Sequence, residues 1–549
     1  MISTHGLPGL LGAYATVQGP LFAALARARA PLRQWLASPL MAVPLTAGAG
    51  MALSAAAPLL HALAAAAGTG VALGGAAAFS AALGYGGGRL LARRTAHAPV
   101  RQRGALVLEG EAPAAERGRR ARRAGALRLA GVPLTPEDEV KHFKFIGTTG
   151  TGKSTAIREL LQAALARGDR AVIADPDGGY LRRFFQAARG DVILNPFEAR
   201  SARWDLFAEI GNDYDVEQLA RSLIPDHEGS DRSWRGYART FFSAVTSQAH
   251  AAGSCDVHEL YRLLVVAGTG ELRTLVAGTA AQPFLEEHNG RMFDSIRSVT
   301  SSAVSTLEYV ARQHGAPLAV RAWVRGGEQP GGVLFLPYRA GQIAALRSTI
   351  SAWMRLAIFE AMNRAEGAAP LWFVVDELDA LGQIDGLKDA LARLRKFGGR
   401  CVLGFQSVAQ VSSTYGAGEA QTLVENCGNT LILRCSGSEH GGTSQFASRL
   451  IGEREMLRVQ TSRSQRPTDL WASVTRSEHV ALEAAVMPAQ IEQLSDLSGY
   501  LKLASQPQWQ RVRLRPPPRE YPTAVTAQPR GAAPPGEARS AEVLGHEYP

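Results

Sequence analysis

The chain contains no Asp, Glu, Lys or Arg between Gln34 and Gly88, a stretch of fifty-five residues. Cysteine is also scarce, with four among 549 residues and no pair at CxxC spacing. So few cysteines exclude a disulfide-stabilised scaffold and favour a reduced, cytoplasmic body. The sequence also has no internal repeat and no His/Cys cluster with metal-site spacing. It therefore gives no sign of a repeat array or of a structural zinc site.

The uncharged stretch predicts an N-terminal membrane region, because a span needs roughly 20 apolar residues. Two candidate spans fit, at about 40–60 and about 68–90, with a tight turn at His61 between them. Arginines flank both outer ends, so the positive-inside rule places both termini in the cytoplasm. Alanine and glycine dominate the stretch. A buried, alanine-rich helical hairpin of a soluble protein is therefore the alternative.

The net charge of +10 does not by itself indicate nucleic-acid binding. Residues 89–128 contain eleven arginines and three glutamates, and residues 1–33 contain three arginines and no acid. These two segments account for the whole excess, so the rest of the chain is close to neutral. We expect the arginine-rich segment to lie against anionic lipid on the cytoplasmic face, with a DNA contact as the second choice.

A phosphate-binding loop is predicted by the stretch FIGTTGTGKSTAI at 145–157, which fits G-x-x-x-x-G-K-[ST]. A β-type run at 140–146 precedes it, and helical periodicity followed by Gly168 comes after it. A further apolar run, 170–174, completes a βαβ unit, the context that makes this motif credible. In such a loop Lys153 contacts the β- and γ-phosphates of ATP and Ser154 holds Mg²⁺. The predicted nucleotide-binding residues are Gly147, Thr148, Thr149, Gly150, Thr151, Gly152, Lys153, Ser154 and Thr155.

Two later strands supply the remaining parts of a hydrolysis site. The apolar run 371–375 ends in Asp376 and Glu377, and an acidic pair at the end of a buried strand is costly unless it has a function. We assign Asp376 to Mg²⁺, with Ser154, and Glu377 to the base that positions water. The run 400–405 ends in Gln406, an amide that can sense the γ-phosphate and orient the attacking water.

The order of these elements predicts an α/β fold with a mainly parallel, doubly wound sheet. Helical periodicity dominates between the two halves of that sheet, and the last residues are rich in Pro, Ala and Gly. The predicted boundaries are a membrane region at 1–95, a basic linker at 96–130, a nucleotide-binding domain at 131–211 and 323–510, an all-α insertion at 212–322 and a disordered tail at 511–549.

These motifs resemble those of the coupling proteins of bacterial conjugation and type IV secretion, the TraD/TrwB type. The resemblance rests on FIGTTGTGKST, on DPDGGYLRRFF (175–185) with ILNPFEARSARWDLF (193–207), and on the block at 372–416 around WFVVDELDALG. It covers roughly residues 130 to 460, while the N-terminal part matches in layout only. The short loop between the spans, the long basic linker and the Pro-rich tail depart from the family pattern.

The resemblance implies a RecA-like ATPase that assembles into a homo-hexamer in the bacterial inner membrane. Its implied partners are single-stranded DNA, a relaxase with its accessory proteins, and the secretion channel. It also points to an arginine acting on the neighbouring subunit's nucleotide, at Arg395 in this sequence, although a solvated basic turn fits equally well there. Two other functions stay open: a membrane tether in which ATP serves assembly, and a pump for double-stranded DNA.

Overall fold

The structure is a computed structural model that describes residues 7–28, 30, 32–93, 100–109, 127–225, 232–326, 332–438, 442–464 and 473–515. The chain divides into two compact units. The first comprises Met1–Arg103 with Glu455–Leu482, and the second comprises Gly104–Arg454 with Glu483–Pro549. The predicted tail starts at 511, but this boundary is wrong because residues up to Arg513 form strand β17 (Trp509–Arg513). The rest of the tail, beyond 515, and most of the arginine-rich segment, 110–126, lie outside the described residues.

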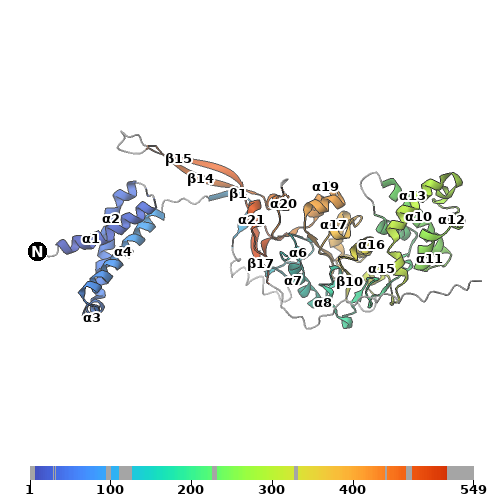
Figure 1. The fold of residues 1–549 in the computed structure, drawn as a ribbon, viewed down its shortest axis with the longest axis horizontal. Helices are drawn as coiled ribbons and strands as arrows, with labels where there is room; N and C mark the ends of the chain where they lie inside the picture. Colours follow the sequence, from blue (N-terminus) through green and yellow to red (C-terminus); the bar gives the residue numbers. More distant parts are fainter. Residues whose placement is uncertain are drawn as a thin grey trace, which may run out of the picture. The chain divides into compact units, whose positions relative to one another are not determined.

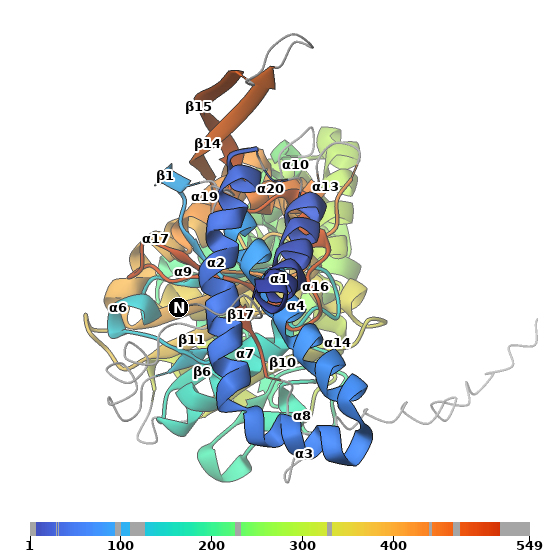
Figure 2. The same ribbon diagram turned by 90° about the vertical axis from the view of Figure 1, so that its left-hand side faces the viewer.

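The described residues of the first unit form four helices: α1 (Leu7–Arg27), α2 (Leu32–Ala55), α3 (Ala57–Ala67) and α4 (Thr69–Arg93). Figure 2 shows α3 lying across the ends of α2 and α4. Two glycines four residues apart let α4 approach α1 closely. A Cβ on Gly84 would lie 2.1 Å from the Val17 carbonyl oxygen, and one on Gly88 would lie 2.7 Å from the Ala24 Cβ. Small residues at this spacing are the means by which helices pack in lipid, where no hydrophobic effect drives them together.

The helix boundaries correct part of the predicted membrane region. The turn predicted at His61 is wrong, because the alanine-rich segment 57–67 continues as α3. The first predicted span, 40–60, crosses the break at Ala56 between α2 and α3. Among the described residues one helix, Gln34–Ala55, is long and apolar enough to cross a membrane, with a mean hydropathy of 1.5. The second span, 68–90, lies in α4, where glycine is frequent, and it stays a prediction.

A three-stranded sheet is formed by β1 (Val100–Gly104), β14 (Glu453–Ser464) and β15 (Ser473–Ala484), in that order. Arg103 Nε lies 2.6 Å from Glu455 Oε2 across β1 and β14. Strand β1 and strand β2 (Val107–Leu108) both lie within residues 96–130, the predicted basic linker. The linker prediction is therefore wrong for these two segments, because β1 pairs with β14 and β2 pairs with β17.

The second unit is built on a ten-stranded sheet, visible edge-on in Figure 1. Its order is β2, β17 (Trp509–Arg513), β16 (Ser498–Lys502), β13 (Asn429–Ile432), β5 (Phe143–Ile146), β12 (Gly399–Phe405), β11 (Leu371–Val375), β6 (Arg170–Pro176), β10 (Val333–Tyr338) and β7 (Val192–Ile193). The strands from β13 to β7 are all parallel. Only β16 runs antiparallel to its two neighbours. This arrangement confirms the predicted α/β fold with a mainly parallel sheet.

Strand β11 shows why the apolar runs are continuous. Leu371, Phe373 and Val375 belong to one core cluster, and Trp372 and Val374 belong to the other. The first cluster includes the inner side of α16 (Ile343–Ala361), and the second includes the inner side of α7 (Lys153–Ala166). A strand covered by helices on both faces has no solvent side, so every position is apolar. Polar residues can then appear only at its ends, which is where the predicted site residues lie.

A helical insertion lies between β8 (Arg203–Trp204) and β9 (Pro317–Leu318), two short parallel strands. Its helices form a cluster beside the sheet, green in Figure 1. They are α9 (Asp213–Leu223), α10 (Arg232–Ala251), α11 (Val257–Tyr261), α12 (Thr269–Leu275), α13 (Gly290–Val304) and α14 (Leu307–Ala311). Phe241 and Phe293 meet edge-to-face with ring centroids 5.2 Å apart, joining α10 to α13. In the range 212–322, predicted to be all-α, the described residues form these helices, short 3₁₀ and π turns, β9 and the start of α15 (Val320–Arg325).

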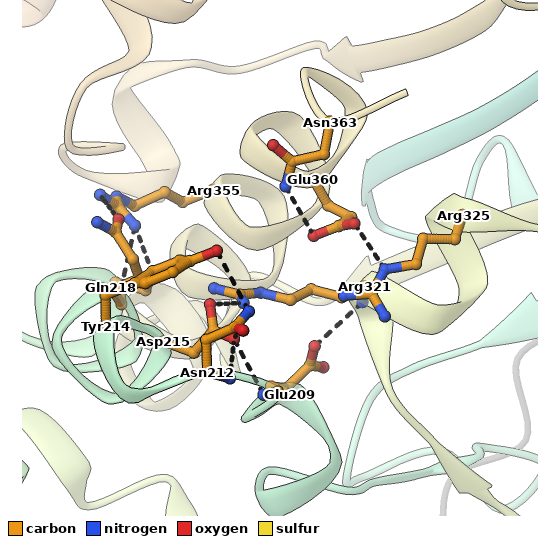
Figure 3. Close-up of polar contacts among 12 residues, drawn as sticks. Glu209, Asn212, Tyr214, Asp215, Gln218, Arg321, Arg325, Arg355, Glu360 and Asn363 are labelled. Atoms are coloured by element: carbon orange, nitrogen blue, oxygen red, sulfur yellow. Dashed lines mark hydrogen bonds and ion pairs between the residues drawn. The ribbon is translucent and has the colours of Figure 1, made fainter. Parts of the chain in front are cut away.

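Buried polar groups fasten the insertion to the sheet domain, as Figure 3 shows. Glu209 accepts hydrogen bonds from the backbone N–H groups of Val320 (2.6 Å) and Arg321 (3.0 Å), at the start of α15 (Val320–Arg325). Asp215, on α9, forms an ion pair with the Arg321 side chain. Burial alone would raise the pKa of Asp215, but the bond and charge of Arg321, together with bonds from the Gly211 and Asn212 N–H groups, lower it. The turn that contains Glu209 and the first helix of the insertion, α9, are thereby both bound to α15, the helix that follows the insertion.

A buried histidine directly before β5 gives a test of this core. His142 is 2% exposed, and its Nδ1 accepts a hydrogen bond from the Cys401 N–H (3.1 Å). Its Nε2 lies 2.9 Å from the Leu391 carbonyl oxygen, so the ring is the neutral Nε2–H tautomer. Burial, opposed by the bond to the Leu391 carbonyl and aided by the charges of Arg395 and Arg400, lowers the pKa of His142 to about 4.

The unfolded chain therefore binds this proton more readily than the folded chain. We expect the free energy of unfolding to fall as the pH drops from about 6.5 towards 4, by roughly 3 kcal/mol from this group. Urea unfolding at neutral pH and at about pH 5, in the wild type and in His142→Gln, measures the effect. The variant should lose part of the acid dependence. An identical slope in both proteins would contradict the assignment.

Candidate nucleotide-binding site

The predicted phosphate loop connects β5 to α7 at the carboxyl edge of the sheet. Gly150 (φ 78°) and Gly152 (φ 119°) have left-handed backbone conformations that L residues avoid. The loop is also anchored from the two neighbouring strands. The Gly147 N–H donates to the Phe405 carbonyl at the end of β12 (3.1 Å). The Thr148 N–H donates to the Arg434 carbonyl just after β13 (2.9 Å). The loop is thus fixed in place by the strands on either side of it.

Lys153 begins α7 and its side chain folds back into the loop. Its Nζ donates to the carbonyl oxygens of Gly147 (2.6 Å) and Thr148 (3.2 Å). Burial lowers the pKa of Lys153, and the carboxylates of Asp376 and Glu377 oppose that shift. An ammonium held inside a curled loop at a helix N-terminus creates a site for phosphate oxygens.

The two residues assigned to Mg²⁺ lie in direct contact. Ser154 Oγ donates to Asp376 Oδ2 at 2.6 Å, although 222 residues separate them. Asp376 is 5% exposed and follows β11, two strands from the loop-bearing β5. A hydroxyl beside a carboxylate is an oxygen donor set of the kind that Mg²⁺ takes alongside phosphates. The residues present therefore fit the metal that the sequence predicts.

Glu377 is connected to the phosphate loop through Gln406. Gln406 Nε2 donates to Glu377 Oε1, and Thr149 Oγ1 donates to Gln406 Oε1 at 3.1 Å. Burial raises the pKa of Glu377, and the carboxylates of Asp379 and Asp376 raise it further. A carboxylate with a raised pKa next to a charged loop is suited to accepting a proton near neutral pH. The order of β5, β12 and β11 places Gln406 between the loop and Glu377.

The structure places the remaining predicted residues as follows. Thr151 Oγ1 donates to the Thr148 carbonyl (2.8 Å) and closes the loop, while Thr155 lies in the first turn of α7. Arg395 is exposed in a 3₁₀ turn, η7 (Arg395–Phe397), that precedes β12. Because Gln406 follows the other end of β12, Arg395 lies at the opposite edge of the sheet from the loop. It cannot act on the nucleotide of its own chain, so its role in trans stays a prediction.

Tyr180 belongs to the site but was not predicted. Its hydroxyl donates to Asp376 Oδ2 at 2.8 Å, on the same oxygen that Ser154 contacts. Tyr180 comes from the loop between β6 and α8 (Leu181–Phe184). The signal in the sequence is the DPDGGY segment at the end of a buried strand, which carries the family resemblance but does not by itself assign a role to Tyr180.

The segment after Glu377 lies along α16. Arg347 Nε donates to the Ala380 carbonyl (3.0 Å) and Arg355 Nε donates to the Asp385 carbonyl (3.1 Å). Arg355 also reaches α9, where its Nη2 donates to Gln218 Oε1 (2.9 Å), as Figure 3 shows. The segment that follows Glu377 and the first helix of the insertion, α9, are therefore both bound to α16.

Known proteins share this architecture. Residues 126–515 match the family model described as the type IV secretion-system coupling protein DNA-binding domain. Coupling protein TraD of Escherichia coli (strain K12) is 31% identical over 382 residues, which are 69% of this chain and 53% of TraD. The chain thus spans about half the length of this curated relative.

Solved structures of the conjugative coupling protein TrwB are also similar. An unbound form is 30% identical with a TM-score of 0.69 and covers 79% of this chain and 97% of its own. A TrwB complex with ADP and Mg²⁺ is 30% identical with a TM-score of 0.67, covering 78% and 96%. The complex with the ATP analogue ADPNP has the same identity and coverage, with a TM-score of 0.66. The likeness confirms the RecA-like P-loop fold, and the chain belongs to the family of type IV secretion-system coupling proteins.

Proposed function

We propose that this chain is a membrane-anchored ATPase that couples ATP hydrolysis to the transfer of single-stranded DNA through a type IV secretion channel. The observation that carries the proposal is the contact between Gln406 and Glu377, continued to Thr149 of the phosphate loop. A protein that used ATP only for assembly would need the loop but not a water-activating carboxylate. The TrwB complexes with ADP and Mg²⁺ and with ADPNP support the choice of cofactor.

The residues divide the chemistry among them. The loop N–H groups and Lys153 bind the phosphates, and Ser154 with Asp376 would hold Mg²⁺. The metal, when bound, neutralises charge on the phosphate oxygens. Glu377 accepts a proton from the attacking water, and Gln406 orients that water relative to the loop. In a homo-hexamer Arg395 of one subunit would stabilise the charge that develops at its neighbour's nucleotide.

The test of this function is DNA-stimulated hydrolysis by the purified full-length protein. Single-stranded DNA should raise the rate of ATP hydrolysis several-fold in the oligomer. Equal or greater stimulation by double-stranded DNA would favour a duplex pump. No response to either DNA would count against a motor and favour a tether that recruits a relaxase and its substrate to the channel.

The N-terminal unit would anchor this motor in the bacterial inner membrane. We propose that α2 and α4 both cross it, with the two termini in the cytoplasm. Gln34–Ala55 supports the first crossing by its length and hydropathy, and close packing of α4 on α1 through glycine supports the second. Alkaline extraction of membranes should leave the protein in the pellet, and its release into the soluble fraction would contradict the anchor.

A further inference from the structure

The loop after β6 places the Tyr180 side chain in contact with Asp376. Asp175, fully buried at the end of β6, accepts hydrogen bonds from the backbone N–H groups of Tyr180 (3.0 Å) and Leu181 (2.7 Å). Asp177 (φ 57°) and Gly178 (φ 65°) both have left-handed backbone conformations, which turn the chain back on itself. The loop is therefore held by a side chain of the strand that it follows.

Tyr180 is enclosed from a second direction by the phosphate-loop helix. Its side chain is 1% exposed, and the Arg158 guanidinium of α7 lies 5.4 Å from the centre of its ring. A Cβ on Gly179 would lie 2.8 Å from Arg158 Nη2, so the backbone packs directly under this cation. Burial and the charge of Asp376 raise the pKa of Tyr180, which keeps its hydroxyl protonated and donating.

We propose that Tyr180 is a positioning residue for the metal site: its hydroxyl fixes the orientation in which Asp376, together with Ser154, holds Mg²⁺. The inference rests on the proposed ATPase function. Two donors, Ser154 Oγ and Tyr180 OH, converge on the same oxygen of Asp376 at 2.6 and 2.8 Å. Hydrogen bonds to a carboxylate are short and strong, and ligands of a metal are commonly oriented by such partners. Asp175 and Arg158 in turn fix Tyr180.

The opposing interpretation is that Tyr180 is only a core residue whose hydroxyl needed a partner, as buried tyrosines commonly do. The two interpretations differ in how Tyr180→Phe responds to Mg²⁺. The variant keeps the ring and loses only the hydroxyl. If Tyr180 positions Asp376, the Mg²⁺ concentration for half-maximal binding of a fluorescent ATP analogue should rise about tenfold, the loss expected for one hydrogen bond to a charged group. Binding of the analogue without Mg²⁺ should not change.

Tyr338→Phe is the matched control in the same full-length protein. Tyr338 ends β10 at the same edge of the sheet, is 4% exposed, and its hydroxyl has no hydrogen-bond partner among the described residues. This variant should keep the wild-type Mg²⁺ midpoint. Thermal unfolding of all three proteins separates stability from metal binding.

An unchanged Mg²⁺ midpoint in Tyr180→Phe, whether or not the protein is less stable, would overturn the proposal. So would an equal shift in Tyr338→Phe, since the effect would then not be specific to Asp376. If the wild type itself shows no Mg²⁺-dependent nucleotide binding, the proposed ATPase function fails, and this inference fails with it.

Discussion

Lys153→Ala is expected to abolish ATP hydrolysis while leaving the protein folded and in the membrane. The Lys153 ammonium bonds only to carbonyls of its own loop, Gly147 and Thr148, among the contacts of the described residues. Its removal takes away the positive charge that opposes phosphate charge in the transition state. We expect hydrolysis to fall at least about a hundredfold, the range seen when one such stabilising donor is removed. Phosphate release by equal amounts of membrane-extracted protein measures it.

Lys144 gives a matched control for this experiment. Its Nζ is also buried and also donates to two backbone carbonyls, Val424 (2.9 Å) and Cys427 (2.6 Å), but it lies within β5 and away from the loop. Lys144→Met should lower thermal stability without a specific loss of hydrolysis per folded protein. Hydrolysis that survives in Lys153→Ala, or is lost equally in both variants, would contradict the role given to Lys153.

Glu377→Gln should separate nucleotide binding from hydrolysis. Glutamine keeps the size of the side chain and an oxygen that can accept the bond from Gln406, so the site should stay assembled. It cannot accept a proton from water. We expect ATP affinity to stay close to the wild-type value while turnover falls by about a hundredfold or more. Equilibrium binding and single-turnover hydrolysis, measured on the same preparation, give the two quantities.

A second variant, Asp379→Asn, tests how the rate of hydrolysis depends on pH. Burial and then the charge of Asp379 raise the pKa of Glu377. Removing that charge lowers the pKa of Glu377, so the base stays ionised to a lower pH. Hydrolysis should therefore persist in this variant, with its acid limb moved to lower pH. Turnover by Glu377→Gln close to the wild-type rate, or an acid limb that moves upward in Asp379→Asn, would contradict the role of Glu377 as the base.

The parts of the site that the sequence could predict are those that depend on local order along the chain. The loop needs Gly150, Gly152 and Lys153 in one short segment. Asp376 and Gln406 each end an apolar run, and parallel strands bring such ends to one edge of the sheet. The hydrophobic pattern along the chain was sufficient to predict these features and the helical character of the insertion.

Contacts between distant segments could not be predicted in this way. Tyr180 and Asp376 are 196 residues apart in the chain. Their contact depends on the loop after β6, which Asp175 holds through its bond to the Tyr180 N–H. Strands β16, β17 and β2 extend the sheet beyond β13. No helix separates β16 from β17, and β2 comes from a much earlier part of the chain, so the alternation of helix and strand does not reveal them. The turn at His61 failed for a different reason, because alanine favours helix more strongly than a single polar residue favours a turn.

Conjugative transfer of a plasmid from cells that contain only Glu377→Gln tests the central claim most directly. This variant should bind ATP, reach the membrane at wild-type abundance and assemble, so only hydrolysis is removed. The motor account predicts that transfer falls to the level of cells that lack the protein. Transfer at the wild-type frequency would contradict it and would show that ATP binding alone is enough, as expected of a tether.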